Sequence, residues 1–307
     1  MSESSLKGEK LVGVEISKSV LKAVSVDRSG NLTDTARVAI DREQEFYPQL
    51  AGFINELKTK FGNFDKIGVA VPGLIHQLTK RVAFSTFIPE HEKIDFLQEL
   101  ETATDLKITI ENDANAAAYA EFLLGAGRDC QNMFYATLGT GIGGAFIFDG
   151  KIWRGATGFA GEFGHIIINS EGLKLEAVAS SESIVRRTRK RFHQDHTSSL
   201  NKLQEEQIKL ADVISAANKE DDFARLMLER TGTYVGTAIA NVINLLNIEK
   251  IVIGGEIMQA EHLVLDAIIA RARKLSFAPS FEATEIVAGG LGENSAAVGV
   301  ALLLAAS

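Results

Sequence analysis

Two stretches of the sequence combine residue types suited to phosphate chemistry. In LGTGIGG, residues 138–144, four glycines are interrupted only by Thr140 and Ile142. Glycines leave backbone N–H groups unobstructed, so such a turn can direct several of them, and the Thr140 hydroxyl, at a phosphate. In ENDANAAA, residues 111–118, Asn112 and Asp113 precede a run of small residues. A carboxylate near a phosphate cradle suggests transfer of a phosphoryl group to a hydroxyl whose proton the carboxylate takes.

Asn112 and Asp113 lie where the apolar segment KITIE is predicted to end as a strand and an alanine-rich helix to begin. Open α/β sheets bind their ligands at the carboxyl ends of strands. An aspartate before such a helix is also a common N-cap. From these residues alone both roles are open for Asp113, and they can coexist.

The elements that would position these residues follow a repeated order. The first half is predicted to hold strands at 11–16, 20–27, 35–40, 66–71 and 107–111 and helices at 44–60, 97–103 and 114–124. The second half is predicted to hold strands at 132–138, 145–148, 151–153, 250–253 and 285–288 and helices at 176–192, 203–217, 223–246, 262–275 and 295–304. Three opening strands in each half, followed by alternating helices and strands, suggest a duplicated unit.

Length and composition limit the class of protein. The hydrophobic cores of single domains stop growing near ~250–300 residues, so a chain of 307 residues is predicted to form two lobes. We expect a smaller N-terminal α/β lobe of 1–122, joined by a closing helix at 293–307, and a larger C-terminal α/β lobe of 123–292. A net charge of −8 argues against a nucleic-acid partner. The single cysteine, Cys130, excludes an intrachain disulfide. With no apolar leader or membrane-spanning run, we expect a cytoplasmic protein with no membrane partner.

Three longer segments resemble the ROK family of sugar kinases and sugar-responsive repressors, within the hexokinase, actin and Hsp70-like ATPase superfamily. ENDANAAAYAE is similar to the family's catalytic segment, residues 138–165 to its second phosphate motif and sugar-binding segment, and INLLNIEKIVIGGEI to its adenosine region. The resemblance implies a two-lobed ribonuclease-H-like α/β fold with a duplicated β-β-β-α-β-α-β-α unit. It also implies a small-molecule sugar substrate, ATP and Mg²⁺ as cofactors, and a homodimer.

The resemblance implies roles for individual residues. Asp113 matches the general base, which takes the proton from the sugar hydroxyl as it attacks the γ-phosphate, and Asn112 matches a ligand of a sugar hydroxyl. The residues that match the rest of the sugar site are Gly73, against which the sugar packs, and Glu162, His165 and Glu176, which bind it near its anomeric end. Those that match the nucleotide site are Glu15, Lys18 and Ser19 in the first phosphate turn, Gly139, Thr140 and Gly141 in the second, and Gly254 and Gly255 beneath the adenosine.

The first phosphate turn departs from the family pattern, which usually reads Asp-x-Gly-x-Thr. Here it reads EISKS, residues 15–19. Glu15 keeps a carboxylate that could hold Mg²⁺ through water. Ser17 and Lys18 replace glycines and narrow the approach of a phosphate, although Lys18 adds positive charge. Phe87 is a further departure, because an asparagine usually binds the sugar at the aligned position before Ile88-Pro89.

The segment between His165 and Glu176 departs as well. The family usually has a cysteine-rich zinc motif there, whereas this sequence reads IIINSEGLKLE. Without thiolates, His165 alone cannot supply a tetrahedral zinc site. We therefore expect no zinc, with His165 held by packing or hydrogen bonds. His193 and His196 suggest a metal pair, but their polar surroundings favour a surface loop.

These observations favour an ATP-dependent hexose kinase of glucokinase type, acting on the 6-hydroxyl of glucose or a related hexose. The alternative is a sugar-sensing protein of the same family whose kinase activity is weakened or lost. Because about ten residues precede the first predicted strand, we expect no DNA-binding domain.

Overall fold

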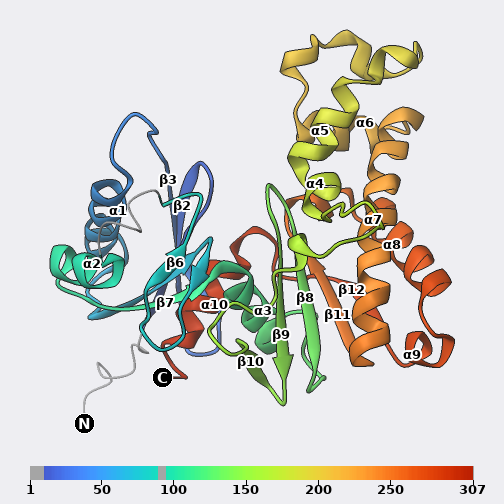
Figure 1. Cartoon of the computed structure of the whole chain (residues 1–307). Helices are drawn as coiled ribbons and strands as arrows, with labels where there is room; N and C mark the ends of the chain where they lie inside the picture. Colours follow the sequence, from blue (N-terminus) through green and yellow to red (C-terminus); the bar gives the residue numbers. More distant parts are fainter. Residues whose placement is uncertain (1–9, 89–94, 307) are drawn as a thin grey trace. The chain divides into compact units, whose positions relative to one another are not determined.

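The computed structural model describes residues 10–88 and 95–306, shown in Figure 1. The described residues form two units, each with its own core. The first holds the residues up to Arg128, Lys151–Ala160 and those from Glu293 onward; the second holds Asp129–Gly150 and Gly161–Gly292. Residues 123–128 and Lys151–Ala160, placed by sequence in the C-terminal lobe, thus group with the first unit. The polar N-terminal residues 1–9, and Pro89 of the sugar-site alignment, lie outside the described residues.

The first unit is built on a five-stranded sheet in the order β3-β2-β1-β4-β7. β1 pairs antiparallel with β2 and parallel with β4, and β4 pairs parallel with β7. Two short strands, β5 and β6, form a separate ribbon. The bounds are β1 Leu11–Ile16, β2 Val20–Val26, β3 Leu32–Ala39, β4 Lys66–Val71, β5 Leu74–Ile75, β6 Val82–Phe84 and β7 Lys107–Asn112.

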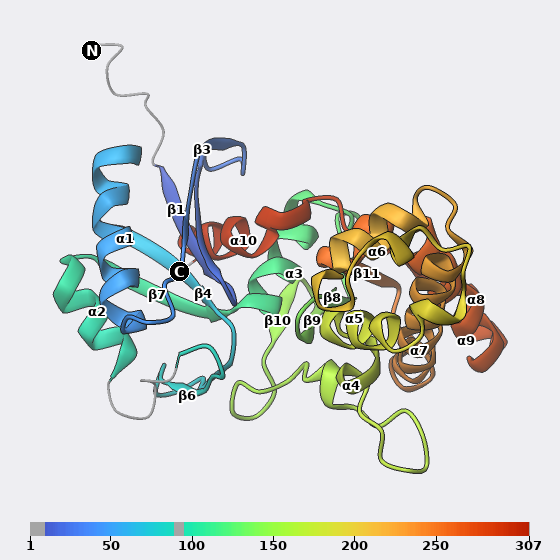
Figure 2. The same cartoon turned by 90° about the horizontal axis from the view of Figure 1, so that it is seen from above.

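Helices cover both faces of this sheet, with α1 and α2 on one face and α10 on the other in both views (Figures 1 and 2). The amphipathic helix α1 buries Leu50, Ile54 and Leu57 against the sheet. α3 and α10 are rich in small residues, and α10 is apolar except for Ser295. The bounds are α1 Phe46–Phe61, α2 Phe96–Thr104, α3 Asp113–Leu124 and α10 Ser295–Leu303.

A second five-stranded sheet repeats this strand order and runs β10-β9-β8-β11-β12; β9, β8, β11 and β12 lie in the second unit, and β10 is among the residues that group with the first. β8 pairs antiparallel with β9 and parallel with β11, and β11 pairs parallel with β12. The bounds are β8 Met133–Leu138, β9 Ile142–Phe148, β10 Lys151–Trp153, β11 Lys250–Gly254 and β12 Glu285–Ala288. The two sheets therefore share the duplicated topology that the order of predicted elements suggested.

The helices of the second unit pack into one core with β8 and β11. α7 and α8 lie side by side, and a Cβ atom on Gly232 would stand 2.6 Å from the Val264 carbonyl oxygen. None of the described helices has the length and apolar character that crossing a membrane requires. The α-helical bounds are α4 Glu176–Ala179, α5 Ser181–Arg189, α6 Leu210–Ala217, α7 Asp222–Leu246, α8 His262–Leu275 and α9 Ala278–Glu282. The 3₁₀ helices are η3 Phe163–His165, η4 Phe192–Gln194, η5 Ser199–Lys202, η6 Glu205–Gln207, η7 Glu256–Ala260 and η8 Gly292–Asn294.

Three sequence predictions about these elements were wrong. The helix expected at 176–192 is broken at Ser180, where the backbone is extended. The Ser180 side chain caps α5, because it accepts from Ser183 N–H. The helix expected from 203 begins at Leu210, because 3₁₀ turns precede it. Gly143 and Gly144 lie in β9, paired with Thr137 and Ala136, so the glycine-rich turn spans only residues 139–141.

Small residues permit an unusually close approach of α10 to its neighbours. A Cβ atom added to Gly13 of β1 would lie 2.0 Å from Ala297 O, and one added to Gly68 of β4 would lie 2.3 Å from Val300 O. On the other side, a Cβ atom on Gly299 would lie 1.7 Å from Ala116 O of α3. The backbones of α10, the sheet and α3 are thus in direct contact.

We expect Gly299→Ala to destabilise the protein by about 2 kcal/mol or more, because the methyl group overlaps a backbone atom that cannot move cheaply. Gly52→Ala is the matched control, since no atom lies within 4 Å of the added Cβ in α1. There the same change should stabilise by about 0.5–1 kcal/mol through helix propensity. Thermal denaturation of both variants checks this, and equal shifts would contradict the close-packing argument.

Candidate functional site

A first group of predicted site residues, in the first unit, lies at the carboxyl ends of β4 and β7. These strands are parallel, with Val71 opposite Asn112, so the turn after β4 and the start of α3 meet at one edge. Asn112 Nδ2 donates to Gly73 O at 3.0 Å and to Asp113 Oδ1 at 3.1 Å. The structure thus brings together Gly73, Asn112 and Asp113, as the sequence predicted.

Asp113 is not the N-cap of α3. That role belongs to Asn112, whose Oδ1 accepts from Asn115 N–H at 3.0 Å. Asp113 is the first residue of the helix, and its Oδ1 also accepts from Ala114 N–H at 2.9 Å. Its half-buried carboxylate therefore lies in the first turn of α3, where the helix dipole favours negative charge.

Asn112 and Asp113 are supported by a buried ion pair that the sequence reasoning missed. Glu111 is 7% exposed, and its Oε2 accepts from Arg154 Nε at 2.9 Å and Nη2 at 2.5 Å. Its Oε1 accepts from the Asn115 side chain and from Asn112 N–H, both at 3.0 Å. Glu111 therefore ties Arg154, from the segment after β10, to the end of β7 and the first turn of α3.

We expect Arg154→Met to lower the free energy of unfolding by about 1–3 kcal/mol, because it leaves the Glu111 carboxylate buried without its cation. Amide exchange at Ala114 and Asn115 should rise with it. The control is Arg81→Met. The Arg81 side chain, which pairs with Asp95, is 64% exposed, so this change should lower the free energy of unfolding by at most about 0.5 kcal/mol. Unchanged exchange in Arg154→Met would show that the ion pair does not support α3.

The first phosphate turn is the tight hairpin between β1 and β2. Ser17 uses its own polar groups there, because both its N–H (3.1 Å) and its hydroxyl (2.8 Å) donate to Val20 O. Lys18 and Ser19 are exposed at the tip. The side chains of Lys18 and Ser19 are thus placed at the surface of the turn, as a phosphate contact would require.

Glu15 is buried beside this turn, at the end of β1. Lys22 on β2 lies with its Nζ 3.6 Å from Glu15 Oε2 and donates to Glu293 O at 3.0 Å. Burial raises the pKa of Glu15 to about 7; the positive charge of Lys22 lowers it, and the negative charge of Asp113 raises it. Glu15 Oε2 has no hydrogen-bond partner. A carboxylate with an open lone pair beside a phosphate turn is a donor suited to Mg²⁺, directly or through water.

Stability should depend on pH through Glu15. The folded pKa of about 7 lies above the ordinary value of 4.5, so the folded state holds the proton more tightly. Protonated Glu15 therefore adds to the free energy of unfolding, measured relative to Glu15→Gln. This contribution should be fully present below pH ~4.5 and decline by up to roughly 3 kcal/mol as pH rises to ~7.

Denaturant titrations across this range, without divalent cations, measure the difference between wild type and Glu15→Gln. The control is Glu56→Gln, on the exposed side of α1, which should give a curve parallel to wild type. Parallel curves for Glu15→Gln would mean that the pKa of Glu15 is the same in the folded and unfolded states.

A second group of predicted site residues, in the second unit, surrounds the turn between β8 and β9. Gly139 N–H donates to Gly141 O at 3.0 Å, which closes the turn. Glu176, the first residue of α4, lies against it, because Ile142 N–H donates to Glu176 Oε2 at 2.8 Å. A Cβ atom on Gly141 would stand 3.3 Å from that oxygen. The backbone amide of Ile142, next to the turn, is therefore already hydrogen-bonded to Glu176.

Glu162, His165 and Glu176 are gathered around η3. Burial raises the pKa of Glu162; the charge of His165 lowers it, and that of Glu176 raises it. His165 Nδ1 lies 3.2 Å from Lys174 Nζ. The structure thus places the three predicted sugar ligands close enough to interact, with His165 in a hydrogen bond as expected.

Gly254 and Gly255, predicted to lie beneath the adenosine, have a packing role. A Cβ atom on Gly254 would lie 2.3 Å from the Tyr135 hydroxyl, and Gly255, at φ +94°, would place one 2.4 Å from Leu138 O. The following Glu256 was missed by the sequence reasoning. Its Oε1 accepts from Ser181 Oγ at 2.5 Å and from Thr140 Oγ1 at 3.4 Å. A carboxylate therefore stands beside the Thr140 hydroxyl of the predicted phosphate loop.

The missed residues share one feature, which is that their partners are distant in sequence. The sequence signal that could have found them was a charged residue beside a motif, as in Glu111, Arg154 and Glu256.

Across residues 10–88 and 95–306 no group of three or more His, Cys, Asp or Glu side chains could hold a metal ion. Mg²⁺ would thus depend on Glu15 together with phosphate oxygens and water.

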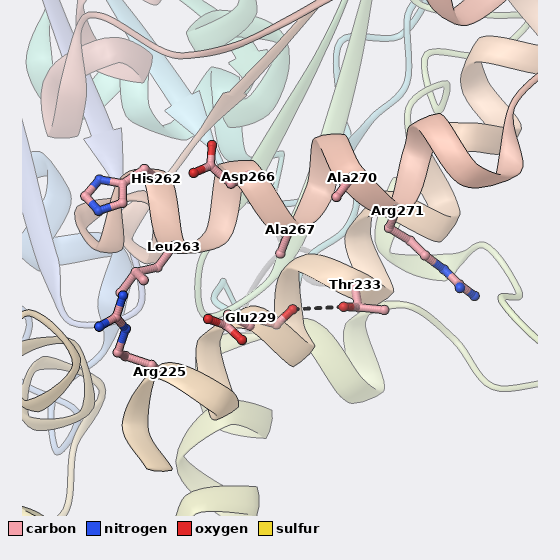
Figure 3. A pocket seen from close by; sticks show the side chains of 9 residues that line it. All are labelled: Arg225, Glu229, Thr233, His262, Leu263, Asp266, Ala267, Ala270 and Arg271. Carbon is pink, nitrogen blue, oxygen red and sulfur yellow. Dashed lines mark hydrogen bonds between the residues drawn. The ribbon is translucent and has the colours of Figure 1, made fainter. Parts of the chain in front are cut away.

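A hollow of about 540 Å³ lies elsewhere on the second unit, between α7 and α8. Figure 3 shows residues from both helices around it, among them Arg225, Glu229 and Thr233 of α7 and His262 and Asp266 of α8. Both charge signs line it, and none of the predicted catalytic or binding residues does.

Comparisons with known proteins cover nearly the whole chain. A family model described as "ROK family" matches residues 11–307. The glucokinase of Halalkalibacterium halodurans is 29% identical over 306 residues, covering 94% of this chain and 92% of that protein. The xylose repressor of Bacillus subtilis is 26% identical, over 95% of this chain and 76% of the repressor.

A solved structure agrees in fold. The ROK family glucokinase from Streptomyces griseus, determined with glucose and AMPPNP, is 27% identical with a TM-score of 0.86, over 96% of this chain and 98% of that chain. The predicted fold class is confirmed: an α/β protein of the actin and hexokinase type, with a duplicated sheet.

Proposed function

The chain belongs to the ROK family, and from this premise we propose that it is an ATP-dependent hexose kinase. It transfers the γ-phosphoryl group to a sugar hydroxyl, which we propose to be the 6-hydroxyl of glucose or a related hexose. The observation that carries the proposal is the arrangement of Asp113 and Asn112 beside Gly73. Similarity to a glucokinase over almost the full length of both chains supports it.

In this mechanism Asp113 takes the proton from the attacking hydroxyl. Its Oδ1 accepts from Ala114 N–H and Asn112 Nδ2, and these two hydrogen bonds orient the carboxylate at the first turn of α3. Asn112 binds a neighbouring sugar hydroxyl. Arg154 and Glu111 hold this corner in place, so the carboxylate needs little rearrangement during the reaction.

The second unit would hold the other end of the sugar and the nucleotide. Glu162, His165 and Glu176 bind the sugar near its anomeric end. The nucleotide's phosphates are held by Gly139, Thr140 and Gly141 and by Glu15, Lys18 and Ser19, with Gly254 and Gly255 beneath the adenosine. Mg²⁺, when bound, neutralises polyphosphate charge. We further propose that the protein is a cytoplasmic homodimer that binds neither nucleic acid nor membranes.

The test is a coupled assay of ADP release with Mg²⁺ and ATP over glucose, mannose, fructose, allose, N-acetylglucosamine and N-acetylmannosamine. A kinase turns over at least one of these sugars well above the ATPase background. Specificity among them depends on which hydroxyls the buried polar groups satisfy.

In the same assay Asp113→Asn should lower kcat by about 10²–10⁴-fold, because an amide cannot accept the proton. The sugar KM should change little, since asparagine keeps the Oδ1 acceptor that meets Ala114 N–H. Asp149→Asn is the control, because the exposed Asp149 has a φ of 49° that asparagine also adopts. Near-normal turnover by Asp113→Asn would refute Asp113 as the base.

A second function is favoured by the first phosphate turn and by the similarity to a repressor. Ser17 and Lys18 stand in the turn where the family has glycines, and Ser17 spends its polar groups on Val20 O. The alternative is a sugar-sensing protein of the same family whose kinase activity is weakened or lost. Sugar binding by calorimetry with no turnover on any sugar of the panel would establish it in place of the kinase.

A further inference from the structure

The chain between η3 and α4 closes on itself as a small hairpin. Ile168 N–H donates to Leu173 O at 2.9 Å, and Leu175 N–H donates to Ile166 O at 3.0 Å. At the tip, Leu173 N–H donates to Asn169 Oδ1 at 2.9 Å. Backbone hydrogen bonds and one asparagine therefore give this segment its shape.

The hairpin register brings Lys174 to His165. Ile167 is paired with Lys174 in an antiparallel bridge, and Lys174 Nζ lies 3.2 Å from His165 Nδ1. A lysine ammonium group has three donors and no acceptor. The contact is thus a hydrogen bond only if His165 Nδ1 is the acceptor, and a neutral imidazole that accepts at Nδ1 carries its proton on Nε2.

A zinc ion does not fit this segment. Residues 166–175 contain no cysteine, and no cluster of three suitable donors exists among the residues that the structure describes. The lysine ammonium group already occupies the Nδ1 side of His165, and a second positive charge on that nitrogen would be unfavourable. The donor set therefore disagrees with the zinc motif usual in the family.

We propose that Lys174 is a positioning residue that replaces a metal ion: it holds His165 as the Nε2–H tautomer, ready to donate a hydrogen bond to the substrate. The neighbouring carboxylates of Glu162 and Glu176 supply acceptors, so the group as a whole can bind a hydroxyl as donor and acceptor together. The substrate part of this proposal rests on the proposed sugar kinase function. The tautomer part does not.

Lys174→Met, which keeps the length of the side chain without its charge, tests the proposal. Lys174→Arg restores a donor that cannot accept, and Lys219→Met, at an exposed position, is the matched control. ¹⁵N spectra of the imidazoles, recorded about two pH units above the ordinary histidine pKa, report the tautomer directly. The spectrum of His165→Gln assigns the resonance among the six histidines.

We expect the Nε2–H tautomer for His165 in wild type, Lys174→Arg and Lys219→Met, and a shift toward the Nδ1–H tautomer in Lys174→Met. On a sugar that the enzyme phosphorylates, Lys174→Met should raise KM by about 3- to 10-fold with kcat nearly unchanged. The reason is that the hydrogen bond from His165 to the sugar is no longer oriented. Metal analysis should find no stoichiometric zinc.

An unchanged tautomer in Lys174→Met would overturn the proposal, as would one zinc ion per chain that is lost in His165→Gln. If no sugar is phosphorylated but the tautomer shifts as expected, the kinase assignment fails while the role of Lys174 stands. If sugars are phosphorylated but the tautomer does not shift, the kinase assignment stands and Lys174 is only a surface residue.

Discussion

The buried carboxylate of Glu111 is the constraint on which the arrangement of Asn112 and Asp113 depends. A charge that is 7% exposed must be matched by a cation and by hydrogen bonds, since an unpaired one costs several kcal/mol. Arg154 and Asn115 supply them from two different segments. Satisfying Glu111 therefore aligns the end of β7, the start of α3 and the chain after β10, and that alignment places Asn112 and Asp113.

Carboxylates organise the second unit in a similar way. Glu176 binds the amide of Ile142 at the edge of the glycine turn, and Glu256 binds the hydroxyls of Ser181 and Thr140. Each joins segments more than 30 residues apart and supports a turn whose glycines have no side chains to hold it. A turn held by acidic groups needs a cation before it can receive a polyphosphate, which is consistent with a requirement for Mg²⁺.

Two lysines of this chain lie beside groups that the sequence suggested as possible metal ligands. Lys22 lies beside the buried Glu15, and Lys174 lies beside His165. In both places a lysine on a neighbouring strand or bridge stands where sequence reasoning considered a metal ion. An ammonium group neutralises charge without fixing ligand geometry, so the surrounding backbone must provide the shape. The β1–β2 hairpin and the hairpin of residues 166–175 do so through their own hydrogen bonds.

The sequence by itself determined the strand and helix order, the duplicated topology and the residues of the phosphate turn and of ENDAN, because hydrophobic period, glycine content and local motifs are properties of adjacent residues. Gly73, Asn112 and Asp113 lie together because parallel strands bring their carboxyl ends to one edge. Only the tertiary structure decided that Asn112 rather than Asp113 caps α3, and that Arg154, Glu256 and Lys174 contact the site. Those contacts join residues 9 to 116 positions apart. A local sequence pattern does not predict which distant side chain will pair with a given charged group.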